Sequence, residues 1–351
     1  MAERVIFHVD ANSAFLSWSA AYRVKVLGEE LDLRTVPSVV AGDKESRHSI
    51  ILAKSGPAKK YGIQTGEPLF LALEKCPDLK IVEPDYSLYV ECSRHFVEVL
   101  RQFSPCVEQY SIDEAWVDMT GTQRLFGPPV LAADALRRKV LDELGFTVNV
   151  GISSNKLLAK MAGDFEKPNK IHTLFPEEIP SKMWPLPVKD LFLVGSATER
   201  KLRLLGIYTI GDLAKADPVL LRRKLGKHGE TIWHYANGRN AELVTPEPAE
   251  AKGFGNSVTT ARDVTSTEEA HQVLLSLTET AAMRMRREGK YGSCVAVHLR
   301  TNEFHHFSHQ SKLNCATNIT RELYRECARV FDEMWDRKTP LRQLGVQITE
   351  L

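Results

Sequence analysis

The sequence of 351 residues lacks several features that would assign it to a specialised class of protein. It has no apolar run long enough to span a bilayer, and its start, MAERVIFHVDANS, has too short an apolar segment for a signal peptide. Its six cysteines are scattered and none forms a C-x-x-C pair, so we expect reduced thiols and no zinc site. These absences predict a cytoplasmic protein without a membrane partner.

The chain also lacks a charge bias, a low-complexity tract and a long internal repeat. Its formal net charge is +1, so the overall charge argues neither for nor against nucleic acid, and only a local basic surface could speak to that. A hydrophobic content of 43% and a charged content of 26% are those of a soluble globular protein. Because one ordinary core rarely holds 351 residues, we expect two or more domains.

Adjacent carboxylates, Asp113 and Glu114, stand inside YSIDEAWVD (110–118), an aromatic run typical of a strand. Strand side chains alternate between faces, so both acids can share a face only if the strand bends or ends there. A third acid, Asp10, ends the predicted strand RVIFHVD (4–10). If the two strands are neighbours in a sheet, the three acids converge, and protonation or cations must relieve their repulsion. Oxygen ligands favour Mg²⁺, and two such ions can clamp an in-line phosphoryl displacement.

Two further features support phosphate chemistry near these acids. Phe15 lies five residues after Asp10, on the predicted helix 12–28 that starts beside them. Lys160 and Lys167 are seven residues apart in NKLLAKMAGDFEK, which we expect to be a helix with both lysines on one face, as point-charge partners for phosphate. Taken alone, each feature has a simpler explanation: a metal-free core acid, a helix cap, a packed Phe or a solvated helix face.

The segment LFLVGSATERKLRLLGIYTIGDL (191–213) has the pattern of a helix-hairpin-helix element. Gly195 lies in the hairpin and Gly206 ends the second helix, and glycine allows backbone N–H groups to approach a phosphate closely. Lys201 and Arg203 add positive charge beside it, as expected for a grip on a nucleic-acid backbone. The alternative is an ordinary helical pair with a basic surface.

The order of predicted elements indicates an α+β fold in several parts. A sheet covered by helices on one side should form from the residues around the acids, with residues 18–81 as a small inserted unit. Short helices joined by Gly and Pro follow, then a Pro/Glu/Ala-rich linker, AELVTPEPAEAK (241–252). The strands SVTTARDV, SCVAVHLRT and LGVQITEL and two helices predict a separate α+β domain over 253–351.

Together, VDANSAF, YSIDEAWVD, GISSNKLLAKMAGDFEKPN and the hairpin segment resemble the Y-family (translesion) DNA polymerases, closest to the polymerase IV (DinB) branch. The resemblance runs over nearly the whole chain, in the family's order. It implies an α+β right-hand polymerase with a C-terminal α/β domain. The implied parts are a palm (1–17 and 82–172), fingers (18–81), a helical thumb (173–240), the linker (241–252) and a DNA-binding little finger (253–351).

The resemblance also implies roles for single residues. Asp10, Asp113 and Glu114, with the carbonyl of Ala11, would bind two Mg²⁺ ions, with Mn²⁺ as the alternative. Phe15 occupies the position of the family's aromatic steric gate, whose ring lies under the sugar and excludes nucleotides with a 2′-hydroxyl. The implied nucleotide-binding residues are Ala11, Asn12, Ser13, Ala14, Phe15, Ser55, Lys59, Lys160 and Lys167.

The sequence departs from the family pattern at three of these places. Gly56 and Lys59 stand where a tyrosine and an arginine are usual, so Lys59 can neutralise phosphate only as a point charge. Ala14 replaces a usual aromatic beside the gate.

The implied DNA-binding residues are Gly195, Lys201, Arg203, Gly206, Arg284, Arg286, Arg287 and Arg300, the last four forming one face.

The resemblance implies template-directed DNA synthesis of low fidelity across damaged templates. The expected partners are primer–template DNA and dNTPs, and we expect a monomer. The sequence ends at GVQITEL without the clamp-binding tail of many relatives, so a sliding-clamp site elsewhere and a truncated chain both stay open. Two alternatives remain: a catalytically impaired DNA-binding accessory protein of the same fold, and a nucleotidyl cyclase.

Overall fold

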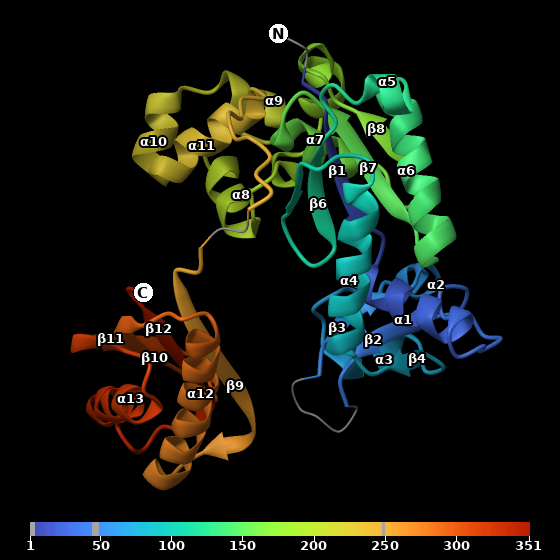
Figure 1. Cartoon of the computed structure of the whole chain (residues 1–351). Helices are drawn as coiled ribbons and strands as arrows, with labels where there is room; N and C mark the ends of the chain where they lie inside the picture. The colour runs from blue at the N-terminus through green and yellow to red at the C-terminus, as the bar shows by residue number, and fades with distance from the viewer. Residues whose placement is uncertain (1–3, 44–48, 248–249) are drawn as a thin grey trace. The chain divides into compact units, whose positions relative to one another are not determined.

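The structure is a computed structural model that describes residues 4–43, 49–247 and 250–351, and these residues form two compact units (Figure 1). The first unit comprises 4–43 and 49–247, and the second comprises 250–351. Within these ranges, no helix is both long and apolar enough to cross a membrane. All six cysteines have free thiols, as predicted.

A five-stranded sheet in the order β5-β6-β1-β7-β8 forms the centre of the first unit. Strand β1 lies in the middle and runs antiparallel to both β6 and β7. All six residues of β1 are buried, as expected for a central strand covered on both faces. The strands of this sheet are β1 (Ile6–Ala11), β5 (Val107–Gln109), β6 (Glu114–Asp118), β7 (Val148–Ser153) and β8 (Ile171–Thr173).

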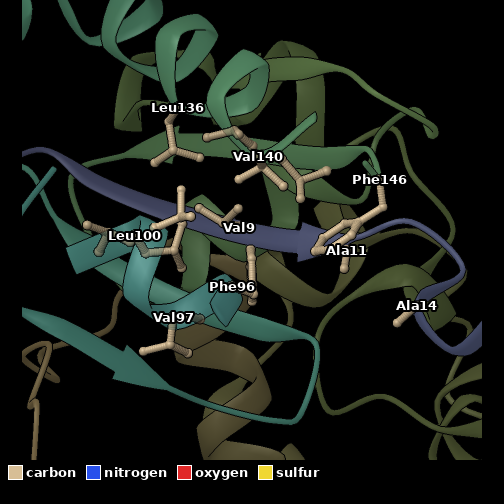
Figure 2. Packing of buried hydrophobic residues seen from close by; sticks show 14 of the residues in the cluster. Val9, Ala11, Ala14, Phe96, Val97, Leu100, Leu136, Val140 and Phe146 are labelled. Carbon is tan, nitrogen blue, oxygen red and sulfur yellow. The ribbon is translucent and has the colours of Figure 1, made fainter. Parts of the chain in front are cut away.

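Two long helices, α4 (Tyr86–Arg101) and α6 (Pro129–Leu144), cover one face of this sheet. Figure 2 shows Val9 of β1 beside Phe96 of α4 and Val140 of α6, in one apolar cluster. Because side chains of a strand alternate, His8 and Asp10 must point to the opposite face. The core packing of β1 therefore decides which way its polar side chains are directed.

The helix α7 (Lys156–Gly163) packs on that opposite face, so the expectation of helices on one side only was wrong. The close approach depends on Gly151 of β7, since a Cβ there would lie 1.9 Å from the carbonyl oxygen of Ala159. The indole of Trp116 in β6 also donates a hydrogen bond of 3.0 Å to the carbonyl of Lys156. A sequence pattern does not reveal this contact between α7 and β7, because it depends on the absence of a side chain at Gly151.

A second sheet, in the order β3-β2-β4, forms within the predicted insert 18–81 and has its own apolar cluster. The expected boundary between residues 17 and 18 falls inside helix α1. Residues 44–48 of this region lie outside the described residues, as do residues 1–3. The elements of this region are α1 (Ala14–Lys25), β2 (Ser38–Ala41), β3 (Ile51–Lys54), α2 (Gly56–Lys60), α3 (Leu69–Lys75) and β4 (Lys80–Val82).

Short helices follow the central sheet and build a third cluster around Leu202, Leu213 and Ile232. The described part of the expected linker, 241–247, contains no helix or strand, but it is anchored: Val244 is buried and the N–H of Thr245 donates to Glu108 at 2.9 Å. Residues 248 and 249 lie outside the described residues. The remaining elements of the first unit are α5 (Gln123–Phe126), η1 (Pro176–Glu178), η2 (Ile179–Met183), η3 (Val188–Asp190), α8 (Ser196–Arg203), α9 (Ile210–Lys215), α10 (Pro218–Leu225) and α11 (Lys227–Ala236).

The second unit is an antiparallel sheet in the order β11-β10-β12-β9 whose apolar face packs against two helices. Strand β11 was not predicted. It lies at the edge of the sheet and most of its side chains are exposed and polar, so it lacks the apolar alternation of a half-buried strand. The elements are β9 (Gly253–Val264), α12 (Thr267–Arg287), β10 (Gly292–Thr301), β11 (His306–Thr317), α13 (Thr320–Met334) and β12 (Leu341–Thr349).

Candidate active site

A pocket of about 360 Å³ lies in the first unit, where β1 ends and β6 begins. It brings together residues from the β1–α1 junction, β3, the turn before β6 and the loop after α7. All three predicted acids are among them. The lining residues are Asp10, Ala11, Ser13, Ala14, Phe15, Leu52, Ala53, Lys54, Thr65, Asp113, Glu114 and Lys167.

Strand register and a tight turn bring the three acids together. Asp10 lies directly opposite Glu114 in the β1–β6 ladder, and the N–H of Ala11 donates to the carbonyl of Asp113 at 3.0 Å. The predicted strand 110–118 is in fact shorter, because β6 begins only at Glu114 and residues 110–113 form the turn from β5. Asp113 is therefore not part of the alternating strand, and both adjacent acids can line one pocket.

Asp10 is a buried acid with one ammonium partner, Lys167, to which it forms an ion pair. Burial raises the pKa of the Asp10 carboxyl, and the charge and hydrogen bond of Lys167 offset only part of this effect. For Lys167, burial alone would lower the pKa, but Asp10 and then Asp164, 2.8 Å away, raise it above its ordinary value. Lys167 thus stays charged beside an acid that ionises reluctantly.

Glu114 is held by two donors that reach the same oxygen, Oε2. One is Nε2 of His8 at 3.1 Å, and the other is the ammonium of Lys160. Burial alone would raise the pKa of Glu114, but the hydrogen bonds and charges of His8 and Lys160 lower it to about 2. Glu114 is therefore a fixed carboxylate at neutral pH.

Asp113 is partly buried and accepts a hydrogen bond of 2.6 Å from the hydroxyl of Ser111 in the same turn. Three carboxylates in one pocket are oxygen donors of the kind Mg²⁺ prefers, so the residues fit that metal in type. Within the described ranges, however, no group of three or more His, Cys, Asp or Glu side chains is arranged to hold a metal ion. The cations next to Asp10 and Glu114 are instead lysine ammonium groups.

The two predicted lysines do not share a helix face, which corrects the sequence-based expectation. Lys160 lies in α7, but the helix ends at Gly163 and Lys167 lies in the loop beyond it. The residue before a proline is disfavoured in helical conformation, and Pro168 follows Lys167 directly. The loop brings Lys167 to Asp10, whereas α7 brings Lys160 to Glu114 and against the rings of Tyr110 and Phe192.

Phe15 lines the pocket and is supported from behind by an aromatic group. Its ring stacks on Tyr89 of α4, with centroids 4.5 Å apart and planes 10° apart, and contacts Trp18 and Tyr86 edge-on or tilted. The Tyr89 hydroxyl is itself hydrogen-bonded to Ser19 at 3.0 Å. Such stacking fixes the ring as one wall of the pocket.

The residues between Asp10 and Phe15 differ in their positions. Asn12 is buried and points away from the pocket, where its side chain bonds to Asn149, Thr147 and the N–H of Asn169. Ser13 is exposed, lines the pocket and has a left-handed backbone, with φ of 48°. Asn12 therefore holds the chain in place, whereas Ser13 and the buried Ala14 form part of the pocket wall.

Ser55 and Lys59, predicted to bind nucleotide, lie near the pocket but do not line it. The Ser55 hydroxyl is buried, caps α2 through the N–H of Ala58 at 3.1 Å and donates to the carbonyl of Val36. Lys59 is exposed on α2. Ser55 is therefore a structural residue in this conformation.

Lys54 lines the pocket and was not predicted. Its ammonium donates to the carbonyl of Ile63 at 2.5 Å, and no described carboxylate lies within ion-pair distance. Burial lowers the pKa of Lys54, and the nearby charges of Lys59 and Lys75 lower it further. A lysine at the end of an apolar strand was the available signal in SIILAKS. His8 was also missed, although a histidine within an apolar strand is unusual.

The predicted hairpin residues lie around α8. Gly195 is the residue that precedes the helix, and Gly206 has a φ of 76° in the turn before α9, a conformation that favours glycine. Lys201 and Arg203 are exposed on α8, and Arg203 pairs with Glu199 at 3.0 Å. In this turn the N–H groups of Gly206 and Ile207 donate to the carbonyls of Arg203 and Leu202, so a backbone grip on phosphate stays a prediction.

The four predicted arginines of the second unit do not lie on one face, contrary to expectation. Arg284 and Arg286 lie near the end of α12 and donate to the carbonyls of Gly255 and Asn318. Arg287 ends the same helix. Arg300 follows buried Leu299 on β10, so it points to the other face of the sheet. Sequence spacing could not show this, because it depends on which face α12 covers.

Comparisons with known proteins agree with this architecture in order and extent. A family model described as the impB/mucB/samB family matches residues 9–164, one described as the IMS family HHH motif matches 176–207, and one described as the impB/mucB/samB family C-terminal domain matches 251–351. The matched segments include the end of β1 with Asp10, the turn with Asp113 and Glu114, and the helices before Gly206.

Curated relatives match along nearly the whole chain. DNA polymerase IV of Clostridium acetobutylicum is 47% identical over 348 residues, which cover 99% of this chain and 87% of that protein. DNA polymerase IV 2 of Bacillus subtilis is 38% identical over 359 residues, covering 100% of this chain and 85% of that protein. Among solved structures, a chain described as the Y-family DNA polymerase chimera Dbh-Dpo4(243-245)-Dbh superposes with a TM-score of 0.83 at 21% identity, over 99% of both chains.

Proposed function

The chain belongs to the Y-family of DNA polymerases and is a DNA-directed DNA polymerase, and we propose that it extends primers with low fidelity by two-metal-ion nucleotidyl transfer. The observation that carries the proposal is the single pocket in which Asp10, Asp113 and Glu114 meet Phe15 and Lys54. Acids at one side and, at the other, a lysine without an ion-pair partner among the described residues suit a ligand that is a metal complex of a polyphosphate. The other expected substrates follow: primer–template DNA and dNTPs.

We propose that Asp10, Asp113, Glu114 and the carbonyl of Ala11 hold two Mg²⁺ ions, with Mn²⁺ as the alternative. When bound, the ions would supply the clamp on the attacking and leaving oxygens of an in-line displacement at the α-phosphate. The carboxylate of Glu114 is already ionised at neutral pH, which suits a metal ligand. Lys167 and Lys54 provide charges for the triphosphate, and the stacked ring of Phe15 restricts the space beside the sugar.

We also propose an assignment of the parts: palm (1–17 and 82–172), fingers (18–81), thumb (173–240), linker (241–252) and little finger (253–351). Two sheets and a helical cluster in the first unit and a separate second unit support this division. Gly195, Gly206 and the cations of α8 would grip the DNA backbone. In the second unit, Arg300 lies on the sheet face that the helices do not cover, whereas Arg284, Arg286 and Arg287 lie on α12. We propose that the uncovered sheet face is the main DNA contact.

We propose that the protein acts as a monomer in the cytoplasm, with a sliding clamp as a further candidate partner. An accessory protein of the same fold would bind DNA without extending it, and a cyclase would need no primer. The three outcomes are distinguished by primer extension with the full chain, with and without Mg²⁺. We expect extension only with the metal; no extension by a folded, DNA-binding protein would overturn the proposal.

Asp113→Asn tests the role of the acids in the same assay. We expect extension to fall by about 10³-fold or more while DNA affinity stays within about twofold, since the substitution removes a ligand charge and little volume. Full extension by this variant would exclude Asp113 as a metal ligand.

Phe15→Ala tests the sugar gate. We expect discrimination against ribonucleotides to fall by at least about 10-fold, because a packed wall of the pocket becomes a cavity. The measurement is the ratio of kcat/KM for a dNTP and its rNTP. An unchanged ratio would remove the gate role from Phe15.

A further inference from the structure

His8 lies on the metal-site side of β1 and contacts Glu114 directly. It precedes Asp10 by two residues, so both side chains point to the same face of the strand. His8 is fully buried, and its Nε2 is 3.1 Å from Oε2 of Glu114. Its ring also lies against Trp116 on the neighbouring strand, with centroids 5.5 Å apart. His8 thus links the central strand to the carboxylate across the ladder.

Two glycines let α7 pack directly over the imidazole. Gly151 lies opposite His8 on β7, and a Cβ on Gly163 of α7 would come 3.2 Å from Nδ1 of His8. Helix α7 therefore packs directly over the ring and, from the same helix, brings Lys160 to Glu114. Strand, ring and helix together surround one side of the carboxylate.

Both donors of Glu114 reach Oε2, and no hydrogen bond from the described residues reaches Oε1. A carboxylate held through one oxygen has a fixed plane, and its other oxygen remains free for a ligand. Because Glu114 lines the pocket, that ligand would be the one the pocket binds.

A purely structural histidine would be a poor choice at this place. Its Nδ1 is buried and has no hydrogen-bond partner among the described residues, and a desolvated polar atom without a partner destabilises the fold. An apolar ring of similar size would fill the space without that cost. The hydrogen bond from Nε2 to Glu114 is the feature that an apolar residue could not replace.

We infer that His8 is a positioning residue for the polymerase reaction: its Nε2–H fixes Glu114 through Oε2 and leaves Oε1 to bind the metal. Partners of this kind, one step removed from a metal, orient its ligands, and their loss commonly weakens metal affinity about 10- to 100-fold. The inference rests on the proposed metal role of Glu114.

His8→Phe removes the donor but keeps a ring, and His8→Gln keeps a donor of similar reach. His172→Phe is the matched control: His172 lies on β8 of the same sheet, and its Nε2 is buried without a hydrogen-bond partner among the described residues. The readouts are Mn²⁺ affinity by electron paramagnetic resonance, on the full chain bound to a dideoxy-terminated primer–template with dNTP, and the steady-state kcat and KM for dNTP.

We expect His8→Phe to weaken Mn²⁺ affinity about 10-fold or more and to lower kcat more than it raises KM. His8→Gln should recover most of both, and His172→Phe should match the wild type. Wild-type Mn²⁺ affinity in His8→Phe, or equal losses in His8→Phe and His8→Gln, would overturn the inference. If wild type itself failed to extend primers, the proposed function would fail instead.

Thermal unfolding of each variant checks that the fold is intact. If His8→Phe does not fold, His8→Gln and His8→Asn decide the question, since both are polar and differ mainly in reach. We expect the longer Gln to keep Mn²⁺ affinity and the shorter Asn to lose it. Equal affinity in these two variants would exclude the contact with Glu114 as the reason for His8.

Discussion

The pKa values of two carboxyl groups on opposite sides of the pocket, Asp10 and Glu114, are shifted in opposite directions. On the β1 side, burial raises the pKa of Asp10 in spite of its lysine partner. On the β6 side, burial would also raise the pKa of Glu114, but His8 and Lys160 lower it to about 2. Both acids face a lysine ammonium, so the number of donors and the depth of burial decide the difference.

The lysine partners of these two acids, Lys160 and Lys167, differ in how exposed they are. The side chain of Lys160 is 10% exposed and lies against aromatic rings, whereas that of Lys167 is 39% exposed and also contacts Asp164. If Lys167 leaves Asp10 for another anion, water and Asp164 can solvate the ammonium, but the buried Asp10 then needs a proton or another cation. Lys160 is part of the fixed framework around Glu114. The comparison separates an exchangeable cation from a permanent one.

The largest expected effect comes from neutralising the acids. Asp10→Asn and Glu114→Gln should each reduce primer extension by about 10³-fold or more, because each removes a proposed metal ligand. The measurement is single-turnover extension with Mg²⁺. If one of the two variants kept wild-type extension, the acid replaced in it would have a structural role and would not be a metal ligand.

A smaller effect is expected on stability when the lysines are replaced. Lys160→Met should lower the free energy of unfolding by about 2–3 kcal/mol, because it leaves a largely buried carboxylate with His8 alone. Lys167→Met should lower it less, since Asp10 can take up a proton once its partner is lost. Urea unfolding at pH 7 measures both. Equal losses would contradict the division into fixed and exchangeable cations.

The smallest effect is a difference in the pH dependence of stability. The contribution of Glu114 is present above its ordinary pKa of 4.5 and is lost as the pH falls toward about 2. The raised pKa of Asp10 has the opposite sign: the native state keeps the proton longer, so stability falls as the pH rises from the ordinary value of 3.8 through the folded value.

Urea unfolding of Asp10→Asn and Glu114→Gln, each compared with wild type between about pH 3 and 6, should show these two signs. Removing Asp10 should flatten a loss of stability with rising pH, and removing Glu114 should flatten a gain. Slopes of the same sign in both variants would mean that the environments of the two acids do not differ as described.

Much of the site was accessible from the sequence because short motifs carry its chemistry. The order of acids, the helix after Asp10 and the glycine-containing hairpin predicted the family, which the comparisons confirm. The predicted helix through Lys167 failed because Pro168 and the packing of Gly163 end it earlier. Lys54 was missed although SIILAKS offered a local signal, and His8 was missed because its contact is with Glu114, 106 positions along the chain.

The sequence by itself determined the family and the enzyme class, and it predicted the three acids that the pocket brings together, since these follow from short motifs in a fixed order along the chain. Only the tertiary structure decided which oxygen of Glu114 is held, which lysine meets which acid and that the strand begins after Asp113. These depend on strand register and on how closely α7 packs against β7. The contacts of Glu114 with His8 and Lys160 and of Asp10 with Lys167 join residues 106, 46 and 157 positions apart, and local propensity carries no information about them.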